Sequence, residues 1–108
     1  MEFDAYQNTA RRTAIYGQRH KVTYPALGLA SDAGEVAGKV KKVLRDRDGE
    51  LGPEQIAALG DELGDVLWYV AVLAADLGLS LDTIAANNLA KLASRQERGA
   101  LGGDGDRR

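Results

Sequence analysis

Apolar residues recur every three or four positions through most of this chain, and short polar stretches rich in glycine or proline separate the runs. This spacing is typical of amphipathic α-helices. The pattern predicts an all-α fold of four helices: about residues 4–18, from Pro25 to the Gly-rich turn at 46–53, from Pro53 to Gly78, and from Ser80 to Gly99.

Proline, glycine and serine mark the predicted helix ends. Pro25 and Pro53 suit the first turn of a helix, where the missing N–H would have no partner. Gly78 suits the position after a helix, and Ser80 is a good N-terminal cap for the next one. Residues 19–24 show no clear period, so we expect a loop there.

The helix that begins at Pro53 is apolar on two sides. Trp68 and Val72 lie opposite the main stripe, and a helix with two apolar sides needs a second buried surface. We expect Trp68 and Val72 at a subunit interface. The main stripe, which we expect to face the core, consists of Ile56, Leu59, Leu63, Val66, Val70, Leu73 and Leu77.

Two glycines, Gly34 and Gly38, share one face of the helix that begins near Pro25. A glycine inside a helix costs about 0.5–1 kcal/mol relative to alanine. The pair therefore suggests the close approach of another backbone or of a ligand, and we favour helix packing.

Length and composition limit the class of protein. A chain of 108 residues fits one domain, which we place at 1–98, before a tail at 99–108 whose composition favours disorder. The chain has no cysteine, so disulfides and thiolate metal sites are excluded. A net charge of −2 does not suggest nucleic-acid binding, and no apolar run is long enough to cross a membrane. We expect a cytoplasmic protein, and its modest size favours an oligomer.

Two acidic doublets carry the candidate chemistry. Asp32 and Glu35 are three residues apart on one predicted helix, and Glu62 and Asp65 repeat the spacing on the next. Residues three apart are neighbours on a helix surface. The short turn makes the two helices antiparallel, so the doublets can face each other. Four carboxylates repel unless a cation lies between them, and oxygen ligands favour Mg²⁺ or Mn²⁺.

Other chemistries lack the residues that they need. His20 is the single histidine and lies in the predicted loop, so neither a zinc site nor a di-iron E-x-x-H site can be built. The chain has no Walker A motif, and no convincing Ser–His–acid set. His20 is either a solvated loop residue or, with Tyr24, a residue over the base of a ligand.

Polar residues near the doublets allow two interpretations. Lys39 follows Glu35 by four residues, which fits a simple ion pair or a phosphate contact. Asn88 lies within an apolar stripe, where an amide needs partners, so it either bonds across the helices or contacts a ligand. Lys91 and Arg95 lie on the margin of that stripe and also suit a helix C-terminus.

Residues 28–42 and 61–69, which contain the doublets, resemble the signature of MazG-like nucleotide pyrophosphohydrolases. These enzymes belong to the all-α nucleoside-triphosphate pyrophosphatase superfamily, whose mark is E-x-x-E followed by E-x-x-D. The similarity continues through 88–95, and the ending at 98–108 resembles the tail of one branch. Asp32 stands where the family usually has glutamate, which shortens one ligand by a methylene group.

The resemblance implies hydrolysis of a nucleoside triphosphate to the monophosphate and pyrophosphate, in nucleotide-pool housecleaning, by a homodimer or homotetramer. It implies that the carboxylates hold Mg²⁺ and that one of them activates water: Asp32, Glu35, Glu62 and Asp65. The implied phosphate contacts are Lys39, Lys42, Lys91 and Arg95. The implied nucleoside contacts are Tyr69 and Asn88, followed by His20 and Tyr24.

Two alternatives remain at this stage. Phosphoribosyl-ATP pyrophosphohydrolases of the same superfamily share the chemistry and differ in substrate. A non-catalytic helical interaction module could instead use the doublets to bind a structural cation. Release of pyrophosphate from a triphosphate separates that module from both enzymes.

Overall fold

The computed structural model describes all 108 residues and contains no strand. Its elements are α1 (Phe3–Arg11), the short 3₁₀ helix η1 (Gln18–His20), α2 (Thr23–Arg47), α3 (Pro53–Asp76) and α4 (Leu81–Glu97). The all-α class and the four predicted helices are confirmed. The first helix is shorter than expected, and α2 begins two residues before Pro25, which still lies within the first turn.

The predicted helix ends are formed by the expected local contacts. The Ser80 hydroxyl accepts a hydrogen bond from Thr83 N at 3.2 Å, as an N-cap does. Gly78 has a φ of +73°, a left-handed conformation that suits glycine after a helix. Pro53 opens α3, where Gly52 N donates to the Gln55 side chain at 3.1 Å.

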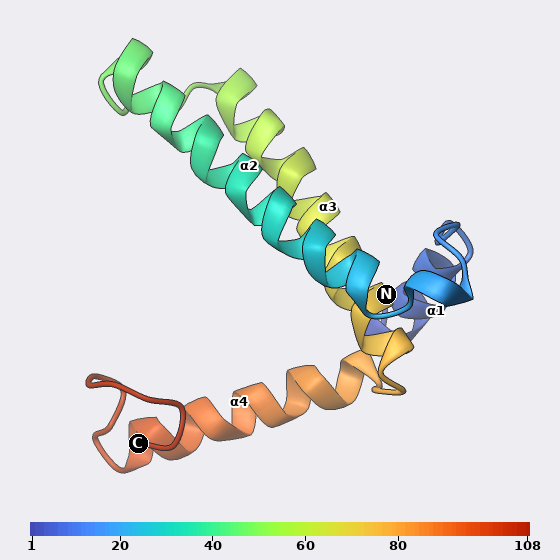
Figure 1. Cartoon of the computed structure of the whole chain (residues 1–108). Helices are drawn as coiled ribbons and strands as arrows, with labels where there is room; N and C mark the ends of the chain where they lie inside the picture. The colour runs from blue at the N-terminus through green and yellow to red at the C-terminus, as the bar shows by residue number, and fades with distance from the viewer.

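The helices form a long antiparallel pair with two shorter helices at one end. α2 and α3 lie side by side, whereas α1 packs against the C-terminal part of α3 and α4 leads away from the pair (Figure 1). The core is small and lies where α1, α3 and the start of α4 meet. It contains Ala10, Ala71, Val72 and Leu81.

A buried glutamine ties α1 to the corner between α3 and α4. The Gln7 side chain donates to the carbonyl oxygens of Ala71 and Leu79 at 3.1 and 2.9 Å. Its own oxygen accepts from Leu81 N at 3.2 Å. Because these partners precede and begin α4, Gln7 holds the direction in which α4 leaves α3.

The expected roles of the two sides of α3 are partly wrong. Val72 is only 1% exposed and belongs to the core of its own chain, so it is not available at a subunit interface. Trp68 is half-buried, and its indole N–H donates to the Thr13 hydroxyl at 2.8 Å. Leu63, expected in the core, is 57% exposed. Helical periodicity shows which residues share a face, but α1 packs on the side that the pattern assigned to a partner.

The chain is more open than a compact subunit. Its radius of gyration is 16.7 Å, whereas a compact chain of this length has about 13 Å. Only nine of 108 residues are buried. A Cβ atom at Gly34 or Gly38 would meet nothing within 4 Å, so the expected close packing at these glycines does not occur within the chain.

The final ten residues fold back onto the end of α4, contrary to the disorder that their composition favoured (Figure 1). The Arg108 guanidinium donates to the carbonyl oxygens of Leu101, Gly102 and Gly105. The Arg98 side chain donates to Arg108 O at 2.8 Å. We call residues 99–108 the tail loop.

No helix is by itself long and apolar enough to cross a membrane. α3 and α4 together would qualify by length and composition alone, but they are bent by 106° at the break between them.

Candidate active site

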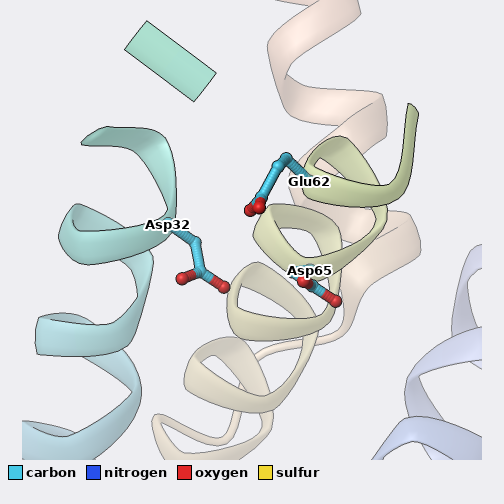
Figure 2. Close-up of side chains that lie close together, drawn as sticks. All are labelled: Asp32, Glu62 and Asp65. Atoms are coloured by element: carbon cyan, nitrogen blue, oxygen red, sulfur yellow. The ribbon is translucent and has the colours of Figure 1, made fainter. Parts of the chain in front are cut away.

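Three carboxylates converge between α2 and α3. Asp32 comes from α2, and Glu62 and Asp65 come from α3, one turn apart (Figure 2). One oxygen from each lies within 4.8 Å of the others. Asp32 and Glu62 are half-buried, while Asp65 is exposed. The antiparallel arrangement predicted from the short turn thus brings both doublets to one place.

This cluster is suited to a hard divalent cation. Mg²⁺ binds oxygen at about 2.1 Å, so two oxygens on one ion lie at most about 4.2 Å apart. The 4.8 Å that bounds the three oxygens is close to this limit. All three donors are carboxylate oxygens, which favours Mg²⁺ or Mn²⁺ over softer metals.

Glu35 lies outside this group. It is exposed on α2, one turn after Asp32. Asp32 lies seven residues before Lys39, which pairs with Glu62 on α3, so these two positions share the face of α2 that meets α3. Glu35 lies to one side of that face. The structure therefore gathers three of the four expected ligands.

Lys39 pairs across the helices. Its ammonium lies 3.8 Å from the Glu62 carboxylate, so its ion pair is with α3 and not with Glu35 four residues earlier. Lys39 and Lys42 also line a hollow of about 440 Å³ near the turn between α2 and α3. Both expected phosphate contacts of α2 thus lie on the side of the cluster that leads to this turn.

On its other side the cluster adjoins a group of aromatic rings. Tyr16 stacks on Tyr24 with 4.9 Å between ring centroids, and Tyr24 lies 6.4 Å from Tyr69. Trp68 meets Tyr69 edge to face at 5.0 Å. We call these four residues the aromatic group. They line a mainly apolar hollow of about 310 Å³ together with Thr13 and Ile15.

Tyr69 connects the aromatic group to the carboxylates. Burial raises the pKa of Tyr69, and the neighbouring Tyr24 and the negative charges of Asp32 and Asp65 raise it further. The ring therefore lies within the field of the cluster. Tyr69, expected near a nucleoside, thus lies beside the carboxylates, and Tyr24, expected there too, lies 6.4 Å from Tyr69 between ring centroids.

His20 lies at a third hollow, which Tyr16 and Tyr24 also line. It is exposed, and with Tyr16, Thr23, Tyr24 and Leu27 it lines a hollow of about 380 Å³. The placement of His20 or Tyr24 over the base of a ligand stays a prediction, and no hydrogen bond fixes the imidazole.

Comparison with known proteins agrees with this geometry. The family model of the MazG nucleotide pyrophosphohydrolase domain matches residues 18–99, which include all three clustered carboxylates. The chain belongs to the MazG family. It is also 46% identical to the Gene 37 protein of Mycobacterium phage L5, and the match covers 100% of both chains. No solved structure matches.

Membership of the MazG family confirms the resemblance seen in the sequence and indicates nucleotide pyrophosphohydrolase activity. The name of the phage relative says nothing of its activity. Members of the family typically depend on a metal, which agrees with the acidic cluster.

The residues of α4 that were expected to contact the substrate do not lie near the carboxylates of the same chain. Asn88 is exposed and makes no hydrogen bond through its side chain. Lys91 and Arg95 both contact Asp106 of the tail loop. All three lie on a helix that leads away from α2 and α3 (Figure 1).

Sequence reasoning missed the residues that shape the start of α2. One Asp76 oxygen accepts from the Tyr16 hydroxyl at 2.7 Å and from Val22 N at 3.0 Å. Val22 has a φ of 66° and a ψ of −54°, and Thr23 N donates to Lys21 O at 2.7 Å. This is a γ-turn of the strained, positive-φ kind. Asp76 and Tyr16 are 60 positions apart, so no local pattern links them.

Proposed function

We propose that this MazG-family chain hydrolyses a nucleoside triphosphate to the monophosphate and pyrophosphate, with Mg²⁺ held by Asp32, Glu62 and Asp65. The observation that carries the proposal is the convergence of three carboxylate oxygens within 4.8 Å, between two helices that have cationic side chains on one side and aromatic rings on the other.

The three carboxylates supply the charge that binds and orients the cation. When bound, Mg²⁺ offsets the charge of the phosphate oxygens and orients them. Lys39, held 3.8 Å from Glu62, can shift its ammonium to an incoming phosphate. Lys42 adds a second cation on the same helix face.

In the proposed reaction a water oxygen forms a bond to phosphorus as the α–β phosphoanhydride bond breaks. The electron pair stays on the departing oxygen, and a carboxylate accepts the proton of the water. Glu35 is a candidate for that base, because it lies one turn from Asp32 and is outside the group of clustered oxygens.

The aromatic group is the proposed site for the nucleoside. Its hollow is lined mainly by apolar and ring atoms. The Thr13 hydroxyl there already donates to Ala10 O and accepts from Trp68. Stacking on aromatic rings contributes about 1–3 kcal/mol per base and tolerates different bases. We therefore propose that Tyr24 and Tyr69 bind the base mainly through its face.

We further propose that the working enzyme is a homo-oligomer. The radius of gyration of 16.7 Å supports this, as do Leu63 and Leu67, which are exposed one turn apart on α3, and the exposed Leu89 of α4. Exposed apolar surface of this kind often marks an interaction site. A second copy would cover the open side between α3 and α4. It would also bring its Asn88 and Lys91 towards a carboxylate cluster that no α4 residue of the same chain reaches. Such an enzyme would serve nucleotide-pool housecleaning in the cytoplasm.

A panel of nucleoside triphosphates tests the proposed activity, with pyrophosphate release measured in Mg²⁺ and in EDTA. We expect the wild-type protein to release pyrophosphate in Mg²⁺ but not in EDTA. We expect Glu62→Gln to release none in either condition. Asp61→Asn is the matched control, because it removes a charge from the adjacent position of α3 but lies outside the cluster. Binding of Mg²⁺ without turnover of any triphosphate would contradict the proposal.

A further inference from the structure

Two cations on α4 are occupied by a carboxylate from the tail loop. Lys91 Nζ lies 3.4 Å from Asp106 Oδ1, and Arg95 Nη2 lies 3.6 Å from the same oxygen. The Arg95 guanidinium also donates to the carbonyl oxygen of Asp106. One residue of the tail loop therefore neutralises two side chains that are four positions apart on one helix.

Arg95 is buried beneath the tail loop, with only 4% of its surface exposed. Its Nε–H has no hydrogen-bond partner. A guanidinium has five N–H donors, and a buried donor without a partner is unfavourable. The cation is thus enclosed but incompletely paired, and it can accept a better-matched anion.

Asp106 itself is open to solvent. Its side chain is 88% exposed, so an anion from solution can compete for its partners. Hydrogen bonding and charge from Lys91, and then the charge of Arg95, hold the pKa of Asp106 below its usual range. The pair with Lys91, whose side chain is 42% exposed, is of the exposed kind that contributes little to stability.

We propose that Lys91 and Arg95 form a polyphosphate site that Asp106 occupies in the free protein. A phosphate group of the substrate displaces Asp106 and releases the tail loop from α4. The inference rests on the proposed function, whose substrate is a nucleoside triphosphate, and on the phosphate contacts that the family resemblance implies for Lys91 and Arg95. It adds that the tail loop competes with the substrate for them.

A phosphate group is the favoured competitor on chemical grounds. It presents more oxygens and more negative charge than one carboxylate, and it matches the fork of an arginine in two hydrogen bonds. The other contacts of the tail loop go to backbone carbonyl oxygens. Arg98, at the end of α4, donates to Arg108 O, and Arg108 donates to Leu101 O within the loop. Asp106 is therefore the contact that an anion can replace.

Tripolyphosphate in EDTA is the probe, because it carries the charge of the substrate and no turnover occurs without metal. We expect Asp106→Asn to bind it about two- to fivefold more tightly than the wild type, as loss of an exposed ion pair would give. Asp104→Asn removes the same charge from the tail loop but breaks no ion pair, so its affinity should stay that of the wild type. Lys91→Gln should bind several-fold more weakly.

Hydrogen exchange of residues 99–108 gives a second measurement. Saturating tripolyphosphate should speed amide exchange of the wild-type tail loop. Equal affinities of Asp106→Asn and Asp104→Asn, or unchanged exchange at saturation, would overturn the inference. Neither readout needs catalysis. If both effects are seen but the wild-type protein hydrolyses no triphosphate, the proposed function alone is overturned.

Discussion

The Tyr69 ring lies against the backbone of Gly28, so close that a Cβ atom at position 28 would be 2.2 Å from Tyr69 Cε1. No side chain fits at this distance, and glycine is therefore required where α2 passes the ring. The contact fixes Tyr69 between the other rings of the aromatic group and the carboxylates.

Gly28→Ala should displace the Tyr69 ring and weaken substrate binding. We expect a rise in KM of about tenfold, as for the loss of about one stacking contact, together with a lower melting temperature. Steady-state kinetics and thermal unfolding measure the two effects. Gly34→Ala is the control on the same helix, because its Cβ would meet nothing within 4 Å. Equal losses in the two variants would show that the ring contact is not the cause.

Glu62→Gln should separate catalysis from stability. The change relieves repulsion with Asp32 and Asp65 and removes an ion pair with Lys39, whose side chain is 37% exposed. Such a pair contributes at most about 1 kcal/mol, so we expect the metal-free protein to keep its melting temperature or to gain slightly. Turnover should fall at least 100-fold, because removing one metal ligand displaces the cation. Melting in EDTA and pyrophosphate release in Mg²⁺ are the measurements, and equal turnover in both proteins would contradict the metal site.

Tyr16 should titrate at unusually high pH. Burial raises its pKa most, and the hydrogen bond to Asp76 and the charge of Asp76 raise it further. In the unfolded chain a tyrosine loses its proton near a pKa of about 10. The stabilisation from Tyr16 is thus intact below pH of about 10 and is lost as the pH rises towards the folded pKa.

Absorbance of the phenolate and unfolding as a function of pH test this expectation. Asp76→Asn should lower the pKa of Tyr16, because the negative charge is removed and the remaining amide oxygen is a weaker acceptor than a carboxylate. Tyr16→Phe should flatten part of the decline in stability above pH of about 10. The pKa values of Tyr6 and Tyr69 are raised too, so some slope should remain. An unaltered tyrosine titration in Asp76→Asn would refute the role given to this carboxylate.

Leu63→Glu should dissociate the proposed oligomer. Leu63 is 57% exposed in the single chain, so a charge there has little to disrupt unless another chain covers it. Leu51→Glu is the control, since Leu51 is similarly exposed, at 53%, but lies in the turn between α2 and α3. Analytical ultracentrifugation should give a smaller species for the first variant alone. A monomeric wild type would remove the basis for a shared site.

The local parts of the structure could be predicted from the sequence, and the long-range parts could not. Ser80, Pro53 and Gly78 act through neighbours within three residues, so their roles follow from residue type. The proximity of Asp32 to Glu62 and Asp65 could also be predicted from the sequence, because the helical spacing and the short turn place these residues side by side. That Glu35 lies outside the carboxylate cluster could not be predicted, because the spacing does not show which residues of α2 face α3.

Other contacts depend on which helix packs where. Val72 was assigned to a partner because the pattern could not show that α1 would cover it. The hydrogen bond between Tyr16 and Asp76 joins a loop to the end of α3. Trp68 and Thr13 are likewise 55 positions apart. No periodicity in the sequence marks such pairs.

The positive φ of Val22 makes this position a natural place to stabilise the protein. A β-branched residue in that region costs about 1–3 kcal/mol, whereas glycine adopts it freely. Glycine also loses more chain entropy on folding, by up to about 1 kcal/mol. The difference favours glycine at position 22, provided that Asp76 still accepts the hydrogen bond from the backbone N–H. Replacement by glycine leaves that N–H in place, so the turn can be relaxed without losing the contact that anchors it to α3.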